Sequence, residues 1–426
     1  MSRRSLPIDA LDRTVAALSD DALAEARHAA LAQFKKRGFP TTRDENWKYT
    51  DLSKVIELSR RSLQTSTDAE RPDIDRIREL QASIDAGWLV IANGKLNRDL
   101  STTLDEDGIE VSPLRLDSKD LRLEDPLADL NLALLKQGLS LRIAANRSTD
   151  RPIALLIVDS AGTAPVLSQV RIDIELQANA EIRFIEYHVS AGDDEHYSNA
   201  HINVIARPNA RADYLRFQDR ALHHSQTARL NVQLETDSEI SYCGIDLGGR
   251  LTRNDLKIDI LGQGASAIFD GLYIAAEGQH VDNHTRVDHR VGPAVSAQEY
   301  RGILNGHCRA IWNGKAIVHA GADGTDAQQA NHNLLLSEHA EIDAKPELEI
   351  YADEVKCAHG TTVGQLDEQA LFYLRSRGLD RDRAKRVLTR AFATSIVNKS
   401  PIPELHDLIG NAVEQRLREL ATGVPQ

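Results

Sequence analysis

Cysteine is scarce in this chain of 426 residues, which contains only Cys243, Cys308 and Cys357. The three lie far apart and form no closely spaced pair, so the sequence indicates neither a disulfide framework nor a zinc module. Isolated thiols of this kind are typical of a reducing compartment. We therefore expect a cytoplasmic protein.

Long apolar runs are also missing. The longest, Ile153 to Val158, is far shorter than the roughly 20 residues that cross a bilayer. Arg3 and Arg4 stand near the N-terminus, but the unbroken apolar stretch of a signal peptide does not follow them. We expect neither secretion nor a membrane as partner.

A positive charge balance and a nucleotide-binding loop are absent as well. The formal net charge of -13 argues against a nucleic-acid partner, because phosphate backbones select faces rich in lysine and arginine. No Walker A motif occurs, so the chain is not expected to bind and hydrolyse ATP by itself, and any energy input would come from a partner. Gly262-Gln-Gly264 imitates a dinucleotide fingerprint, but it precedes a predicted strand, which favours a turn.

Helical patterns occupy both ends of the chain. Ser19 is positioned to cap a helix that ends at Gly38, and Pro126 to Gly138 show helical spacing of leucines. We therefore predict a mostly helical region over residues 1–142. Three more helices are predicted in residues 367–426, one from Asp367 to Arg377, one from Asp380 and one after Pro403.

Between these regions, residues 143–366 show the period of two that is typical of strands, for example in residues 171–176, 201–205 and 256–260. A short motif also recurs there, mostly at intervals of roughly 30 residues. Its copies begin at Ala180, Ala210, Ser238, Ala265, Cys308 and Ala340. Such self-similarity indicates a mainly β protein whose core is a solenoid, in which each rung buries its inner face against its neighbours. A β-sandwich is the alternative, because short alternating strands do not separate the two.

Histidines are concentrated in the later repeats, at positions 280, 284, 289, 307, 319, 332, 339 and 359. Imidazole suits iron, zinc or copper, but hydrogen-bonded or exposed histidine is the ordinary alternative. Asp282, His284, Asp288 and His289 form the densest group. On one strand they could not all face the same way, because successive side chains alternate.

Cys357-Ala-His359-Gly360 joins two potential metal ligands just before the C-terminal helices. One thiolate and one imidazole make an incomplete site, since iron and zinc usually take four ligands. The motif would need donors from another chain. The alternative is a packed cysteine beside a surface histidine.

A longer motif begins at the same cysteine and reads Cys357-Ala-His-Gly-Thr-Thr-Val-Gly-Gln-Leu-Asp-Glu-Gln-Ala-Leu-Phe-Tyr-Leu-Arg-Ser-Arg-Gly378. It closely resembles the C-terminal signature of the SufB/SufD family of iron–sulfur cluster assembly proteins, and within it the SufD branch. Glu45-Asn-Trp47-Lys-Tyr49-Thr resembles the family's N-terminal motif. Gly360 and the low cysteine count favour SufD over SufB.

The resemblance implies a right-handed parallel β-helix core flanked by N- and C-terminal α-helical regions. It also implies a cytoplasmic scaffold that pairs with a SufB paralogue and docks the ATPase SufC through residues 367–426. His359 would be a ligand for transient iron or a nascent iron–sulfur cluster at the SufB interface, with Cys357 as a further candidate. The SufC contact is expected around Leu371, Phe372, Tyr373 and Leu374.

Two further hypotheses compete with this one. Parallel β-helices include enzymes that act on polysaccharides, and Asp282 and Asp288 could form the carboxylate pair of such an enzyme. The chain could also be a purely structural solenoid that binds no metal and forms a homodimer through its exposed ends.

Overall fold

The structure is a computed structural model of the chain. It describes residues 6–18, 20–65, 74–102, 104, 108–116, 125–149, 151–160, 162, 164–192 and 194–422. The predicted cap at Ser19 lies outside the described residues. The helix that it was predicted to begin is present as α2 (Ala24–Arg37), which starts later than predicted and ends before Gly38, as predicted.

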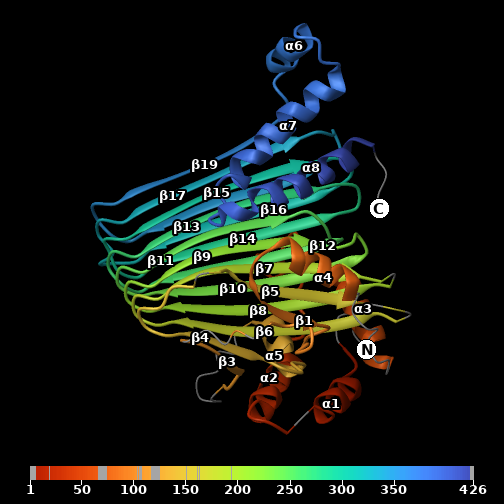
Figure 1. The fold of residues 1–426 in the computed structure, drawn as a ribbon, viewed down its shortest axis with the longest axis vertical. Helices are drawn as coiled ribbons and strands as arrows, with labels where there is room; N and C mark the ends of the chain where they lie inside the picture. The colour runs from red at the N-terminus through yellow and green to blue at the C-terminus, as the bar shows by residue number, and fades with distance from the viewer. Residues whose placement is uncertain are drawn as a thin grey trace.

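Two stacked, mainly parallel sheets form the core of the molecule (Figure 1). In the described residues sheet A has 10 strands, which are β1 (Gly87–Ala92), β2 (Lys95–Leu96), β5 (Ile153–Ser160), β7 (Glu181–Ala191), β9 (Arg211–Asp219), β11 (Glu239–Asp246), β13 (Ser266–Ala275), β15 (Val295–Leu304), β17 (Asp326–Leu335) and β19 (Lys356–Gly364). Sheet B has 9 strands there, which are β3 (Ile109–Pro113), β4 (Leu139–Ile143), β6 (Val166–Leu176), β8 (His196–Ala206), β10 (His224–Leu234), β12 (Leu251–Ile260), β14 (His280–His289), β16 (Arg309–Val318) and β18 (Glu341–Ile350).

From β4 onward the chain alternates between the sheets, and each strand pairs in parallel with the next strand but one. One strand of sheet B and the following strand of sheet A therefore make one rung of a solenoid. This confirms the solenoid over the sandwich. The sandwich is wrong because consecutive strands do not pair with each other.

The corner between sheet B and sheet A explains most of the repeated motif. Four of its copies are each directly preceded by a residue in the left-handed backbone conformation, namely Asn179, Asn209, Asp237 and Gly264. Asparagine, aspartate and glycine tolerate that conformation best, so the turn repeats with the sequence. The last two copies, from Cys308 and Ala340, instead lead into sheet B, where β16 and β18 begin. The six copies are therefore not equivalent positions of one rung.

The core lies between the sheets, where alternate residues of every rung stack on their neighbours. Ile174 and Ile202 of sheet B and Phe184, Tyr214 and Phe269 of sheet A belong to this continuous apolar cluster. Because strand side chains alternate, the remaining positions form the outer faces of the sheets.

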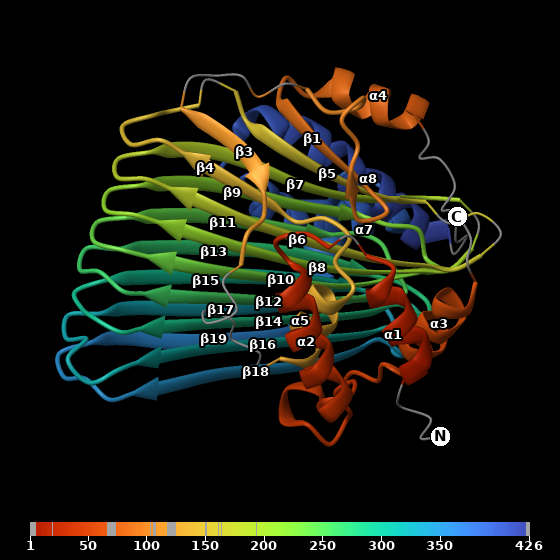
Figure 2. The ribbon, with the colours of Figure 1, turned by 90° about the horizontal axis from the view of Figure 1, so that it is seen from below.

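Helices cover part of both outer faces (Figure 2). α4 (Ile74–Ser83), α7 (Arg381–Val397) and α8 (His406–Thr422) pack on sheet A. α3 (Ser53–Gln64) and α5 (Pro126–Ala133) pack on sheet B. α1 (Ile8–Ala16) packs on α2 (Ala24–Arg37) and α3, and α2 packs on α5. Short 3-10 helices span Glu45–Trp47 and Pro403–Leu405, and α6 (Glu368–Ser376) projects beyond the solenoid in Figure 1.

The predicted helices are confirmed, with adjusted limits. The helix expected over residues 126–138 ends at Ala133, after which the chain leads into β4. β1, β2 and β3 fall inside the region predicted to be mostly helical, and they extend the two sheets. The division of the chain into three regions, with boundaries after residues 142 and 366, stays a prediction.

The N-terminal motif is held on sheet B by a buried ion pair. The Arg253 guanidinium pairs with Asp282, lies 4.4 Å from the centre of the Trp47 ring and donates to the Asn46 carbonyl at 2.9 Å. The Thr50 hydroxyl donates to the same Asp282 carboxylate. This contact explains why an aromatic and polar segment stands between helices at this point in the sequence.

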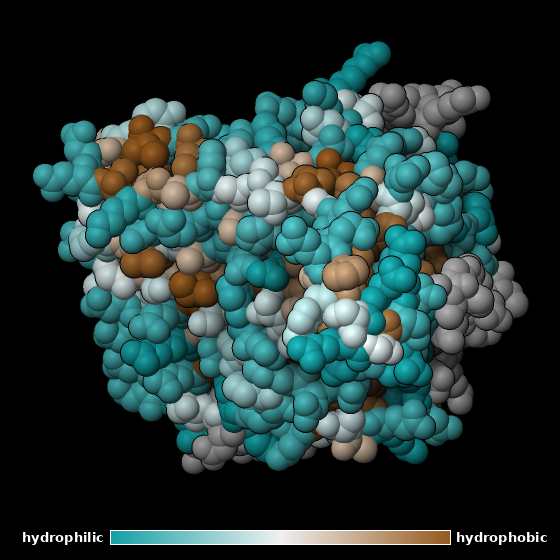
Figure 3. Space-filling model, turned by 90° about the horizontal axis from the view of Figure 1, so that it is seen from above, coloured by the Kyte–Doolittle hydropathy of each residue, from teal (hydrophilic) through white to brown (hydrophobic). Residues whose placement is uncertain are grey.

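The last rung, β18 and β19, forms an open end. Each is the terminal strand of its sheet, and most residues of β19 are exposed. Apolar side chains also reach the surface here, among them Ile350, Tyr351 and Val363. Figure 3 looks at the molecule from above in the orientation of Figure 1, and apolar patches are visible among polar side chains on this face.

Candidate functional site

The eight histidines between residues 280 and 359 differ in whether they have partners. Seven of them contact neighbouring side chains. Six make a hydrogen bond or ion pair, in the pairs His280–Thr50, His284–Asp282, His289–Ser296, His307–Glu277, His319–Asp288 and His332–Thr362. The seventh, His339, stacks on His307. His359 makes no hydrogen bond, ion pair or ring contact within the part of the chain that the structure describes.

The dense group at Asp282 to His289 divides between two faces, as alternation predicts. Asp282, His284 and Asp288 lie on the outer face of sheet B, whereas His289 points between the sheets and contacts Ser296 of sheet A at 2.8 Å. The group is therefore not one metal site. Among the described residues, no three histidine, cysteine, aspartate or glutamate side chains converge as a metal site.

The two aspartates are also poorly suited to glycoside hydrolysis. Burial would raise the pKa of Asp288, but hydrogen bonds from Arg286 and His319 outweigh it and lower this pKa to about 2. Burial opposes ionisation of Asp282 too, yet the nearby Arg253 charge holds its pKa below the usual range. A general acid needs a raised pKa. Both carboxylates instead act as partners in ion pairs.

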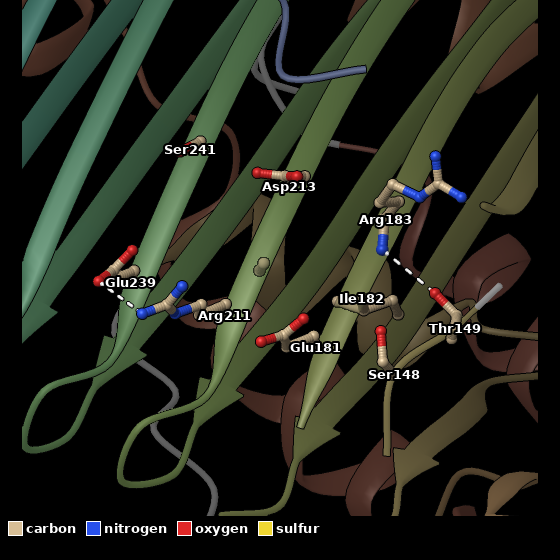
Figure 4. A pocket seen from close by; sticks show the side chains of 10 residues that line it. Ser148, Thr149, Glu181, Ile182, Arg183, Arg211, Asp213, Glu239 and Ser241 are labelled. Atoms are coloured by element: carbon tan, nitrogen blue, oxygen red, sulfur yellow. Dashed lines mark hydrogen bonds and ion pairs between the residues drawn. The ribbon is translucent and has the colours of Figure 1, made fainter. Parts of the chain in front are cut away.

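A hollow on the uncovered half of sheet A is a second surface with carboxylates (Figure 4). Glu181, Asp213 and Glu239 lie there beside Arg183 and Arg211, and Arg211 is 3.6 Å from Glu239. Burial raises the pKa of Asp213. The charges alternate along exposed strands, which is the pattern of a solvated ion-pair ladder and carries no reaction by itself.

The Gly262-Gln-Gly264 segment forms the corner between β12 and β13, and no helix follows it. A side chain at Gly262 would lie 2.0 Å from the backbone nitrogen of Thr236 on the preceding rung. Glycine is therefore required by the close approach of two rungs. The segment is a solenoid corner, in agreement with the turn that the sequence favoured.

Cys357 and His359 lie on β19 and face the interior of the solenoid. Their parallel partners on β17 are Ala327 and Gln329, whose side chains are buried between the sheets. Residues in register on neighbouring parallel strands share a face, and positions two apart along a strand do too. The thiol and the imidazole therefore stand side by side at the open end, with Cys357 half-buried and His359 exposed.

The pair has the chemistry of an incomplete metal site. Burial raises the pKa of the Cys357 thiol, so the free thiol is favoured over the thiolate in the isolated chain. The exposed imidazole of His359 offers one nitrogen ligand without competition from a hydrogen-bond partner. Neither group closes a coordination shell.

The four residues predicted to contact an ATPase lie on α6 and differ in exposure. Phe372 is 72% exposed and Tyr373 is 57% exposed, whereas Leu371 is buried and Leu374 half-buried. Leu371 lines a groove with Leu417 of α8, so it packs the C-terminal helices. The face available to a partner consists of the two aromatic side chains.

Sequence analysis missed a charged cluster between the sheets. The Arg220 guanidinium lies 2.6 Å from Asp159, His196 lies 3.1 Å from the same carboxylate, and His188 lies 2.5 Å from Glu186. All five side chains are buried. They lie at the same alternate strand positions as the apolar core residues. Charged residues at inward-facing positions are therefore the sequence signal from which this cluster could have been found.

The fold and this end rung together define a class: a β-solenoid subunit with a pair of potential metal ligands on an open end and helices on its flanks. Two family models match the chain. The SUF system FeS cluster assembly SufBD core domain matches residues 157–392, and the SufBD protein N-terminal region matches residues 9–68.

Similar proteins agree with these matches. The iron–sulfur cluster assembly protein SufD of Escherichia coli is 29% identical over 91% of both chains. A SufBD family protein of Synechocystis is 26% identical over 95% of this chain and 96% of its own. One from Mycobacterium leprae is 34% identical over 43% of this chain and 49% of its own. The chain belongs to the SufBD family of iron–sulfur cluster assembly proteins and is SufD-like. Within its described residues, no helix is long and apolar enough to cross a membrane.

Proposed function

We propose that this chain is a non-catalytic scaffold subunit of the SUF assembly machinery, pairing with a SufB-type paralogue and binding a SufC-type ATPase. It contributes His359 to a site for iron or a nascent cluster between the two paralogues. One observation supports this most: among the eight histidines from 280 to 359, His359 alone has no partner in the described chain, and it faces the interior of the open end rung.

The ligand chemistry fits a transient site. A neutral imidazole is a borderline ligand that binds iron without the strength of a thiolate set. Cys357, two positions away on the same face, is a second donor once a metal or a neighbouring positive charge favours its thiolate. The remaining ligands come from the partner, and the cluster is cargo that leaves.

The end rung also fits the partner's position. β18 and β19 present unpaired strand edges, which readily pair with another chain. Ile350, Tyr351 and Val363 add apolar surface around them. A paralogue with the same solenoid could continue both sheets. The same edges favour a homodimer when the chain is isolated.

The function is tested by co-expressing the chain with SufB- and SufC-type partners and measuring iron and sulfide in the anaerobically purified assembly. We expect His359→Ala to lose most of the iron and sulfide while the assembly stays intact. His339→Ala, which alters another exposed histidine, is the matched control and should load normally. Equal loading of both variants would contradict the ligand role of His359.

α6 is proposed to dock the ATPase through its exposed aromatic pair. Large aromatic side chains are frequent anchors of interfaces, and those of Phe372 and Tyr373 are presented on a helix that projects from the body (Figure 1). We expect Phe372→Ala with Tyr373→Ala to weaken ATPase binding roughly tenfold or more, measured by calorimetry.

Leu261→Ala removes another exposed apolar side chain, from the solenoid corner between β12 and β13, and serves as the control. Unchanged affinity of the double variant, with its helical content intact, would show that the ATPase docks elsewhere.

A further inference from the structure

Gln329 is a buried side chain whose hydrogen-bonding groups are unused. It lies on the inner face of β17 and is 5% exposed. Neither its amide oxygen nor its amide nitrogen has a hydrogen-bond partner within the described chain. Buried polar groups are nearly always paired, so this carboxamide has hydrogen-bonding capacity to offer a partner at the open end.

The preceding glutamine of the same ladder shows the contrast. Gln298, one rung deeper, accepts a hydrogen bond from the Thr285 hydroxyl at 2.7 Å. The space between the sheets therefore offers a hydrogen-bond partner to Gln298 but none, among the described residues, to Gln329. The indole nitrogen of Trp312, on the other strand of the same rung, is also buried without a partner.

Gln329 is the register partner of His359. Adjacent strands lie about 4.8 Å apart, and in-register side chains point to the same face. The unpaired carboxamide and the unpaired imidazole are thus direct neighbours, with the carboxamide on the buried side and the imidazole at the open end. Ala327, next to Cys357, is too small to offer a competing group.

We propose that Gln329 is the positioning residue for His359: its amide oxygen accepts the N–H of the imidazole when the interface site forms, and the other ring nitrogen faces the metal. This inference rests on the proposed function of His359. Metal-bound histidines almost always donate their second N–H to a carbonyl or carboxylate, which sets the tautomer and the ring orientation.

A neutral amide also suits cargo that must be released. A carboxylate in this place would make the imidazole a stronger ligand, whereas a glutamine orients the ring with less increase in its basicity. The cost of leaving the amide unpaired in the isolated chain is relieved when the imidazole turns toward it.

The test uses the complete assembly with its partners and Co²⁺ as the metal, with binding followed by visible absorption. We expect Gln329→Leu to weaken Co²⁺ binding roughly 10- to 100-fold, the usual effect of removing such a partner. Its melting temperature should stay equal or rise, because an unpaired amide is replaced by an apolar group of similar size. Gln329→Met tests the same point should the leucine variant fold poorly.

Gln298→Leu is the matched control. It leaves the Thr285 hydroxyl without a partner, so it should lower the melting temperature and leave Co²⁺ affinity unchanged. In a His359→Ala background, Gln329→Leu should have no further effect on Co²⁺ binding, since the two residues act through one ligand.

Two failures are distinguishable. If His359→Ala lowers Co²⁺ affinity and Gln329→Leu does not, the positioning role is overturned and the proposed function stands. If His359→Ala leaves Co²⁺ affinity unchanged, the proposed metal site itself is overturned.

Discussion

Arg253→Ala is expected to lower the free energy of unfolding by about 3–5 kcal/mol, the usual cost of removing one partner of a buried ion pair. The substitution leaves the Asp282 carboxylate buried beside Thr50 without its main countercharge. It also removes the cation that lies against the Trp47 ring. The N-terminal motif should therefore detach from sheet B before the solenoid unfolds.

Urea unfolding followed by tryptophan fluorescence measures the loss, and limited proteolysis near residues 41–50 reports the detachment. Arg211→Ala is the control, because this arginine pairs with Glu239 on an exposed strand, where a salt bridge contributes about 0–1 kcal/mol. Replacing both Arg253 and Asp282 by apolar residues should recover much of the stability. If the Arg253 and Arg211 variants lost the same amount, the motif would be held by other contacts.

Lowering the pH from 7.5 to 5 is expected to destabilise the fold by roughly 2 kcal/mol for each of two buried histidines. Burial lowers the pKa of His196 and of His289 to about 4. In the unfolded chain a histidine titrates near 6.5. The unfolded state therefore takes up protons as the pH falls below 6.5 while the folded state does not, so stability is full above that pH and declines toward pH 4.

Below pH 4 a second loss of folding stability begins. Burial would raise the pKa of Asp159, but the Arg220 and His196 charges lower it to about 2. Its contribution to stability is present above the unfolded value near 3.9 and disappears as the pH falls toward 2. Acid unfolding should therefore start with the histidines and end with the carboxylates.

Urea midpoints at pH 7.5, 6.5, 5.5 and 5 measure this profile. His289→Gln keeps a group that can hydrogen-bond Ser296 and removes the titration, so the decline should become shallower. His339→Gln, at an exposed position, should leave the profile unchanged. A midpoint independent of pH over this range would contradict neutral burial of these histidines.

The solenoid was predictable because two signals in the sequence agree. The alternation of apolar and polar residues defines strands, and the recurring segment marks where a corner leads into the next strand. The break in spacing between the copies at Ala265 and Cys308 was not interpretable from the sequence. It marks the change from corners that lead into sheet A to corners that lead into sheet B.

The candidate site was predictable only as a short motif. Cys357 and His359 were found from their residue types and their spacing, but the other seven histidines of the region had the same residue type and no distinguishing pattern. What separates His359 is the absence of a partner in the described chain, and partners such as Asp288 for His319 come from neighbouring rungs about 30 residues away.

The sequence by itself therefore determined the strands, the flanking helices, the repeating rung and the two ligand types at its last strand, because these depend on local patterns of period two and 3.6. Only the tertiary structure decided which polar side chains are paired. Stacking brings Gln329 beside His359 and Arg253 onto Asp282, and it leaves the rung of β18 and β19 uncovered. Whether a buried polar group is satisfied depends on residues far away in the chain, which the local pattern does not contain.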